Sequence, residues 1–190
     1  KAELYKGKGR YVRFRSVDNV LTEISECEKK YQIKSLDFND DIFTLSRSWL
    51  KEFFEKYPRR FSYPFRVNIH AGTVDEETYH QLAQAGCEMV RIGVESGSER
   101  VRREIMNRRI RQEEIIESFK WAEKAGIKTW SFNMVGVPGE TADDALSTYN
   151  LNRELCPDHM QVSVFNPYPG TRLYELCREK GYLKREMVDG

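Results

Sequence analysis

The chain of 190 residues has little of what most protein metal sites are made from. It contains four cysteines and three histidines. The cysteines are Cys27, Cys87, Cys156 and Cys177. They form no CxxC or CxxxCxxC motif, and the histidines lack the spacing of metal ligands. We therefore expect reduced, mostly buried cysteines and no metal ion held by the residues of this chain.

An excess of charge and long apolar runs are missing as well. The 31 basic and 30 acidic residues nearly cancel, so there is no nucleic-acid signal in the charge balance. No apolar run reaches the length of a membrane span, and no signal peptide is visible. We expect a cytoplasmic protein without a membrane partner, and the length suits a single domain over residues 1–190.

Helical and strand-like apolar spacing alternates along the chain. A first helix is expected after the caps Ser16 and Asp18, with its apolar face reaching Tyr31, and a second is expected to stop at Pro58. Strand-like segments lie at residues 33–38, 65–70, 88–94, 127–135 and 159–165. This alternation predicts an α/β fold with a parallel sheet and right-handed crossovers.

Two segments about 40 residues apart, 82–97 and 122–140, share the order helix, Ala-Gly, strand, glycine, acid. A repeat of this length is one βα unit and fits a complete or partial TIM-like (β/α) barrel, or a doubly wound sheet. The chain starts with a basic segment and a helix, whereas a barrel unit starts with its strand. We therefore expect a first strand upstream of Lys1.

Polar residues, glycine or proline follow every predicted strand. In parallel α/β folds the carboxyl ends of the strands carry the active site. The candidates are Asn39, Asp40 and Asp41 after the first strand, Asn68 and His70 at the second, Glu95 and Ser96 at the third, Asn133 and Gly136–Glu140 at the fourth, and 166–170 at the fifth.

Glu95 is the most informative of these residues. Because side chains alternate along a strand, Arg91, Gly93 and Glu95 share one face, opposite the apolar Val90, Ile92 and Val94. The same parity places Arg66 and Asn68 together on the preceding strand. Such a face suits a barrel interior that binds a ligand rich in hydroxyl and ammonium donors.

Simpler interpretations remain open for the other candidates. Asp40 and Asp41 can be turn residues, and Ser98 fits a helix N-cap. Glu140 and Thr141 fit the chemistry of a helix start, and the glycines of the 136–140 segment suit a turn whatever else they do. The basic segment 107–111 fits a solvated turn better than an anion site.

Six segments in order resemble the radical S-adenosylmethionine enzymes. They are RFRSVDNVLTEI, FNDDIFT, RVNIH, RIGVESGSE, NMVGVPGET and NPYPGT. The resemblance covers essentially the whole chain and is closest to the branch often found with a cobalamin-binding domain. It implies a partial or full βα barrel, a four-iron four-sulfur cluster on a CxxxCxxC loop, and reductive cleavage of S-adenosylmethionine to a deoxyadenosyl radical.

The resemblance also assigns roles to individual positions. It implies that Asn39, Asp40 and Asp41 meet the methionyl amine, that Glu95 and Ser96 meet the ribose hydroxyls, and that the turn Gly136–Glu140 passes the adenine. Asn68 and Arg91 would line the barrel, and Tyr168 would meet adenine or substrate. The implied cofactor-binding set is Asn39, Asp40, Asp41, Asn68, Arg91, Glu95, Ser96, Asn133, Gly136, Val137, Pro138 and Tyr168.

The cluster motif itself is not in this sequence. In the family it precedes the RFRS-like segment, so its cysteines are expected just upstream of Lys1, and the present fragment alone is expected to be inactive. The resemblance further implies an electron donor such as a flavodoxin or ferredoxin, and cobalamin through a separate domain. Two alternatives remain: an ordinary βα-barrel enzyme with acid/base or metal-assisted chemistry at Glu95, Asp40 and Asp41, and a non-catalytic nucleoside-binding barrel.

Overall fold

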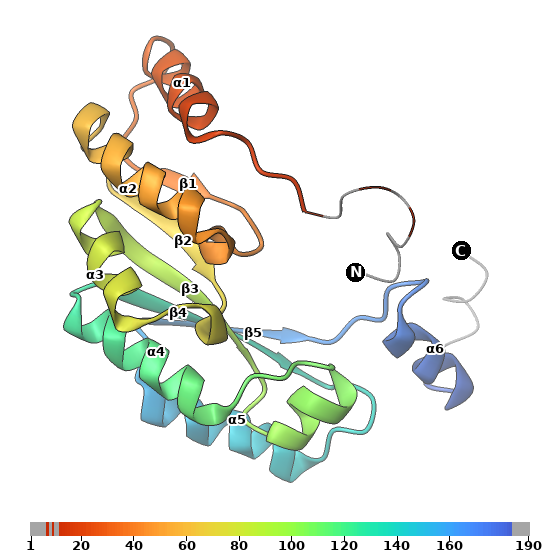
Figure 1. Ribbon diagram of the computed structural model, residues 1–190. Coiled ribbons are helices and arrows are strands. Elements are labelled where there is room, and N and C mark those ends of the chain that lie inside the picture. Colours follow the sequence, from red (N-terminus) through yellow and green to blue (C-terminus); the bar gives the residue numbers. More distant parts are fainter. Residues whose placement is uncertain (1–6, 8, 10–11, 184–190) are drawn as a thin grey trace.

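The computed structural model describes residues 7, 9 and 12–183, and it alternates helices and strands as the sequence predicts (Figure 1). The strands are β1 (Leu36–Phe38), β2 (Phe65–Ile69), β3 (Cys87–Glu95), β4 (Lys128–Val135) and β5 (His159–Val164). The α-helices are α1 (Val17–Glu28), α2 (Arg47–Arg60), α3 (Glu76–Gln84), α4 (Gln112–Lys124), α5 (Ala142–Leu155) and α6 (Arg172–Glu179). Short turns of helix occur at η2 (Phe43–Leu45), η3 (Ala71–Thr73) and the π-helical η4 (Val101–Ile105).

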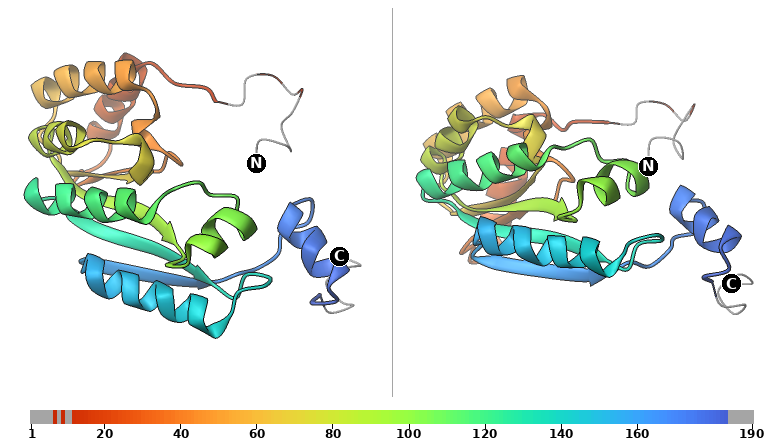
Figure 2. Two further views of the ribbon diagram at one scale, coloured as in Figure 1. Left: turned by 60° about the horizontal axis from the view of Figure 1, so that its bottom comes forward. Right: turned by 90° about the horizontal axis from the view of Figure 1, so that it is seen from below.

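The five strands form one parallel sheet in the order β1-β2-β3-β4-β5. The predicted α/β class with parallel strands is therefore confirmed. The sheet is not closed, because β1 pairs only with β2 and β5 only with β4 among the described residues. Helices α2 to α5 lie along one face of the curved sheet, as in part of a barrel, and α6 stands beyond the carboxyl ends of the strands (Figure 2).

Strand parity separates the two faces of the sheet as expected. On β3, Val90, Ile92 and Val94 are fully buried in the main hydrophobic core, beneath the helices. Arg91 lies on the opposite face, where its guanidinium is 5.8 Å from the centre of the Trp130 ring on β4. The apolar parity of the strand thus directs one face to the core and leaves the other as the inner face of the open barrel.

Helix α2 brings the aromatic part of the core onto β1 and β2. The Phe53 ring packs edge-on against Phe38 and Phe65 at 5.6 and 5.7 Å. The helix does not stop at Pro58 as predicted. Proline removes one backbone hydrogen bond in the last turn, but the Phe61 amide still bonds to the Tyr57 carbonyl at 2.9 Å and closes the helix at Arg60.

The helix starts agree with the predicted caps. The hydroxyl of Ser16 accepts the backbone N–H of Asn19, and the hydroxyl of Thr141 accepts that of Asp144. The apolar face of the first helix is shorter than predicted. Because α1 ends at Glu28, Tyr31 lies outside it and is 69% exposed.

Candidate functional site

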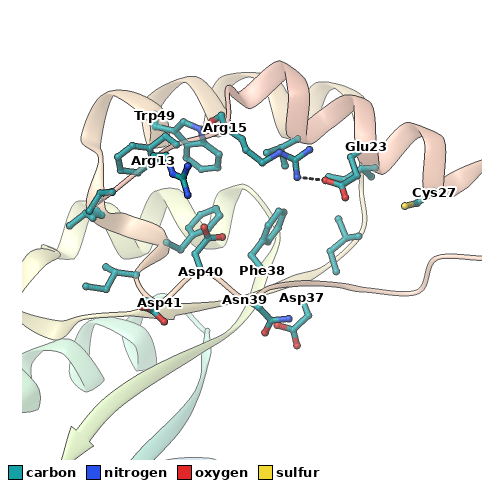
Figure 3. Close-up of a pocket in the computed structure, with 18 of the residues that line it drawn as sticks. Arg13, Arg15, Glu23, Cys27, Asp37, Phe38, Asn39, Asp40, Asp41 and Trp49 are labelled. Carbon is teal, nitrogen blue, oxygen red and sulfur yellow. Dashed lines mark hydrogen bonds and ion pairs between the residues drawn. The ribbon is translucent and has the colours of Figure 1, made fainter. Parts of the chain in front are cut away.

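A hollow of about 1400 Å3 lies beside β1, on the side where this strand has no described partner (Figure 3). The predicted residues Asn39, Asp40 and Asp41 line it. Asp40 points to the side of Arg13, while Asn39 points to the opposite side of the loop (Figure 3). A loop that offers a carboxylate to a hollow, as this one does with Asp40, can accept hydrogen bonds from an ammonium group.

The rim of this hollow is fixed by bonds between neighbouring strands. Asn68 on β2 donates its amide N–H to the Asp40 carbonyl at 2.8 Å, which ties the loop to the sheet. Arg91 on β3 donates to Asp37 Oδ1 at 2.7 Å, makes a second bond to Asp37 Oδ2, and reaches Asn68 Oδ1 at 3.4 Å. The hydrogen bond from Arg91 lowers the pKa of Asp37, and Asp37 in turn raises the pKa of Arg91. The Arg91 guanidinium therefore braces the inner wall.

Glu95 ends β3 in an unusual backbone conformation. Its φ is +65°, in the left-handed region, and the Ser96 amide bonds back to the Val94 carbonyl at 2.9 Å, so that a three-residue turn is centred on Glu95. Such a conformation costs about 1–3 kcal/mol and persists where the surroundings enforce it. The turn directs the carboxylate back over Gly93 on the inner face.

Arg108 holds the Glu95 carboxylate in that position. Its Nη1 donates to Glu95 Oε1 at 2.6 Å, and Glu95 Oε2 has no hydrogen bond to any described residue. Gly93 provides the space, because a Cβ there would lie 2.8 Å from Glu95 Oε1 and 3.1 Å from Arg108 Nη2. The predicted face of Arg91, Gly93 and Glu95 is thus present, with one carboxylate oxygen available to a ligand.

The residues after Glu95 anchor the strand end to helix α5. Ser96 is fully buried, and its hydroxyl lies 3.3 Å from that of Thr148. Gly97 approaches α5 so closely that a Cβ would lie 2.1 Å from the Ser147 carbonyl oxygen, and its N–H donates to Thr148 Oγ1 at 2.8 Å. The Ser98 hydroxyl accepts the Val101 amide at 3.4 Å, in agreement with the predicted cap. The side chain of Ser96 therefore serves this packing.

Two other predicted residues lie apart from the inner face. Asn133 is 3% exposed, accepts a hydrogen bond from Asn152 on α5 at 2.8 Å and donates to Ser131 at 3.1 Å, so its amide lies on the helix side of β4. Tyr168 is 71% exposed, and its carbonyl accepts the Thr171 hydroxyl at 2.7 Å. Within the described residues, neither side chain forms a hydrogen bond with Glu95.

The predicted turn after β4 is present. Gly136 has a φ of +78° and its amide bonds to the Glu140 carboxylate, while the Glu140 amide bonds to the Val137 carbonyl at 3.0 Å. Val137 is buried, and Pro138 follows it in the turn. Glu140 thus has the local turn role that the simpler interpretation gave it.

His70 occupies the carboxyl end of β2 on the inner-face parity of Asn68. Burial, together with the positive charge of Arg108, lowers its pKa, so the imidazole is neutral at neutral pH. Its Nδ1 is buried and has no hydrogen-bond partner among the described residues. His70 is a polar group at the strand ends that none of the predicted roles uses.

Three functional candidates were missed by sequence reasoning: Asp37, Arg102 and Arg108. Arg108 lies in the segment 107–111, for which the sequence predicts a solvated basic turn. That prediction is wrong for Arg108, because the backbone reverses at Asn107, with a φ of +54°, and brings the Arg108 side chain back to β3. Arg102 is fully buried in η4. The sequence did hold one signal for Asp37. It shares the strand parity of Asn39, and the third strand carries Arg91, for which the sequence reasoning named no carboxylate partner.

A metal ion would find no ready-made site here. Among residues 7, 9 and 12–183, no group of three or more histidine, cysteine, aspartate or glutamate side chains is placed to hold one. The four cysteines are unpaired thiols on separate elements. The described residues therefore do not fit an iron–sulfur cluster as its ligands. Nor does any helix in the described part of the chain have the length and apolar character needed to cross a bilayer.

The parallel sheet with polar groups gathered at its carboxyl ends defines a barrel-type ligand-binding fold. Residues 4–151 match the sequence profile of the Radical SAM superfamily, and the chain belongs to this family. Its members use S-adenosylmethionine and a four-iron four-sulfur cluster, as the resemblance of the six segments implied.

Two relatives match over most of the chain. An uncharacterized methyltransferase, PH0819, of Pyrococcus horikoshii is 29% identical over 88% of this chain and 36% of its own length. The cytidylyl-2-hydroxyethylphosphonate methyltransferase of Streptomyces wedmorensis is 24% identical over 94% of this chain and 35% of its own. The chain thus spans about a third of the length of these relatives.

A solved structure has the same fold. TsrM from Kitasatospora setae, a radical S-adenosylmethionine methyltransferase with cobalamin and a [4Fe-4S] cluster bound, superposes with a TM-score of 0.75 at 20% identity. The match covers 87% of this chain and 32% of TsrM. This comparison confirms the predicted partial barrel. TsrM itself holds cobalamin, in line with the predicted likeness to the cobalamin-associated branch.

Proposed function

We propose that residues 1–190 form a single domain, part of the barrel of a longer radical S-adenosylmethionine enzyme, and that this barrel binds the cofactor at the carboxyl ends of β1 to β4. The observation that carries the proposal is Glu95, an inner-face carboxylate with one oxygen held by Arg108 and the other open to a ligand. Family membership supplies the ligand class. In the full-length enzyme, bound S-adenosylmethionine and a [4Fe-4S] cluster supply a deoxyadenosyl radical after one-electron cleavage to methionine.

In this proposal the residues of the chain bind and orient the cofactor. Glu95 Oε2 accepts hydrogen bonds from the ribose hydroxyls, which is the natural match for an acceptor-only carboxylate. Arg108 keeps the carboxylate in one orientation, so little side-chain freedom is lost when the ligand binds. Gly93 keeps the space above the strand clear.

The loop after β1 and the turn after β4 are the proposed ends of the binding site. The side-chain oxygens of Asn39, Asp40 and Asp41 accept hydrogen bonds from the methionyl ammonium group. Asn68 holds their loop in place. The turn Gly136–Glu140 faces the adenine with backbone groups. Asp37 and Arg91 brace the wall between the two ends.

The remaining parts of the enzyme are proposed to lie outside this chain. The cluster cysteines are proposed to come from another part of the full-length enzyme, since the four cysteines of this chain lie on separate elements. The electron donor is a flavodoxin or ferredoxin. Cobalamin bound through a separate domain is supported by the likeness to TsrM, whose structure holds it.

The proposal is tested by replacing Glu95 in the full-length protein, reconstituted anaerobically with iron and sulfide. Glu95→Gln keeps the size of the side chain but removes its charge and its pairing with Arg108. We expect the KM for S-adenosylmethionine, measured from the rate of deoxyadenosine release, to rise about tenfold, which corresponds to about 1.4 kcal/mol. The matched control is Glu99→Gln, because Glu99 is 52% exposed and pairs with Arg103. Equal KM values for the two variants would contradict the assigned role of Glu95.

A further inference from the structure

Arg102 is a buried cation without a carboxylate partner. It is fully buried, and desolvation lowers its pKa. Its Nε and Nη2 atoms are buried and have no hydrogen-bond partner among the described residues, and it forms no ion pair there. An apolar side chain of similar size would avoid this cost, so stability alone does not account for an arginine at this position.

The bonds that Arg102 does make join the two ends of the Glu95–Arg108 pair. Its Nη1 donates to the carbonyl of Ser96, next to Glu95, at 2.6 Å. Its own carbonyl accepts the backbone N–H of Arg108 at 2.7 Å. One residue therefore fixes the backbone beside both members of the ion pair.

Each of these two backbone points also follows a residue with a positive φ. Glu95, with a φ of +65°, precedes Ser96, and Asn107, with a φ of +54°, precedes Arg108. Left-handed conformations of residues other than glycine persist only when neighbouring contacts determine them. The π-helical turn η4, which carries Arg102, lies between the two points, and such turns occur often at functional sites.

We propose that Arg102 is a positioning residue that holds Glu95 and Arg108 in their binding geometry. It acts from beneath the inner face, through the Ser96 carbonyl and the Arg108 amide. This inference rests on the proposed function for the identity of the ligand. The geometry of Arg102, Glu95 and Arg108 follows from contacts within this chain.

The geometric part is tested by hydrogen–deuterium exchange on the 190-residue chain. Arg102→Met fills the buried space but cannot bond to the Ser96 carbonyl. We expect exchange at least tenfold faster at residues 95–98, which the Arg102 side chain holds, and a smaller acceleration at 106–109, because the bond to Arg108 comes from the Arg102 backbone carbonyl. Exchange in β2 and α4 should be unchanged. Arg103→Met is the matched control, because Arg103 lies in the same turn and pairs with Glu99 in solvent. Unchanged exchange at residues 95–98 in Arg102→Met, or equal acceleration in the control, would overturn the proposal.

The binding part is tested in the full-length reconstituted protein. In Arg102→Met we expect the KM for S-adenosylmethionine to rise about tenfold, with kcat changed less than threefold. Arg102→Lys keeps a donor for the Ser96 carbonyl, so its KM should lie within threefold of the parent value. A lower melting temperature with unchanged KM would show a merely structural residue and overturn the proposal. If the unsubstituted protein does not cleave S-adenosylmethionine, the proposed function fails, and the exchange experiment alone decides whether Arg102 positions Glu95.

Discussion

Gly97→Ala is expected to destabilise the fold strongly, although alanine adds one methyl group. The Cβ would lie 2.1 Å from the Ser147 carbonyl oxygen and 2.5 Å from the Thr148 amide nitrogen. Favourable contacts between such atoms begin near about 3.5 Å, so the β3 end and helix α5 must separate by more than about 1 Å. Both obstacles are backbone atoms, and a side-chain rotation cannot relieve them.

The magnitude follows from two costs. Overpacking against a fixed backbone costs about 3 kcal/mol. The separation also breaks the hydrogen bond from the Gly97 amide to Thr148, worth about 1 kcal/mol. A total of about 4 kcal/mol lowers the melting temperature of a chain of this size by about 8–16 °C.

The assay is urea and thermal unfolding followed by circular dichroism, with Gly72→Ala as the matched control. A Cβ at Gly72 would meet only His70 and Glu114 side-chain atoms, at 3.5 to 3.8 Å, so the control should change stability by no more than about 0.5 kcal/mol. Melting of Gly97→Ala within about 2 °C of the control would refute the close contact between β3 and α5.

Gly93→Ala should keep the melting temperature within about 3 °C of the parent value, because the new Cβ meets movable side-chain ends. It should nevertheless displace Glu95 and raise the KM for S-adenosylmethionine about tenfold in the full-length protein, and an unchanged KM would contradict this. The hydrogen bond from Ser98 is the main cause that lowers the pKa of Asp144. The stability that the ionised Asp144 carboxylate contributes is therefore present above about pH 4 and lost as pH falls further. The stability difference between the parent chain and Asp144→Asn, measured by urea unfolding, should therefore be constant above about pH 5 and shrink toward pH 2; a difference independent of pH would count against it. Burial lowers the pKa of His70, so the unfolded chain binds this proton more readily and the folded state loses stability as pH falls below about 6.5. Unfolding between pH 7 and 5 should show a smaller loss in His70→Gln, and identical profiles would refute a neutral, buried imidazole.

Strand periodicity made much of the inner face predictable. Alternation along β3 placed Arg91, Gly93 and Glu95 together, and the structure has them on one face. Short-range caps such as Ser16 were also predictable, because each depends on a hydrogen bond three residues away. Strand faces and helix caps depend on local geometry, which the order of neighbouring residues determines.

The missed features depend on contacts between distant segments. Arg108 reaches Glu95 only because η4 and the reversal at Asn107 return the chain to β3. The close approach of Gly97 to α5 involves residues about 50 positions apart. Asn133 looked like a strand-end ligand, but its parity places it with Asn152 on the helix side. No periodicity specifies which of two mixed polar faces a strand turns toward its helices.

Formation of deoxyadenosine shows directly whether the full-length protein cleaves S-adenosylmethionine by radical chemistry. The full-length protein, reconstituted anaerobically with iron and sulfide, is incubated with S-adenosylmethionine and a low-potential reductant. We expect reductant-dependent deoxyadenosine and methionine in equal amounts from the parent protein, with the rate at limiting cofactor reduced about tenfold in Glu95→Gln. A cluster-loaded protein that yields no deoxyadenosine, or a Glu95→Gln variant with the parent rate, would contradict it.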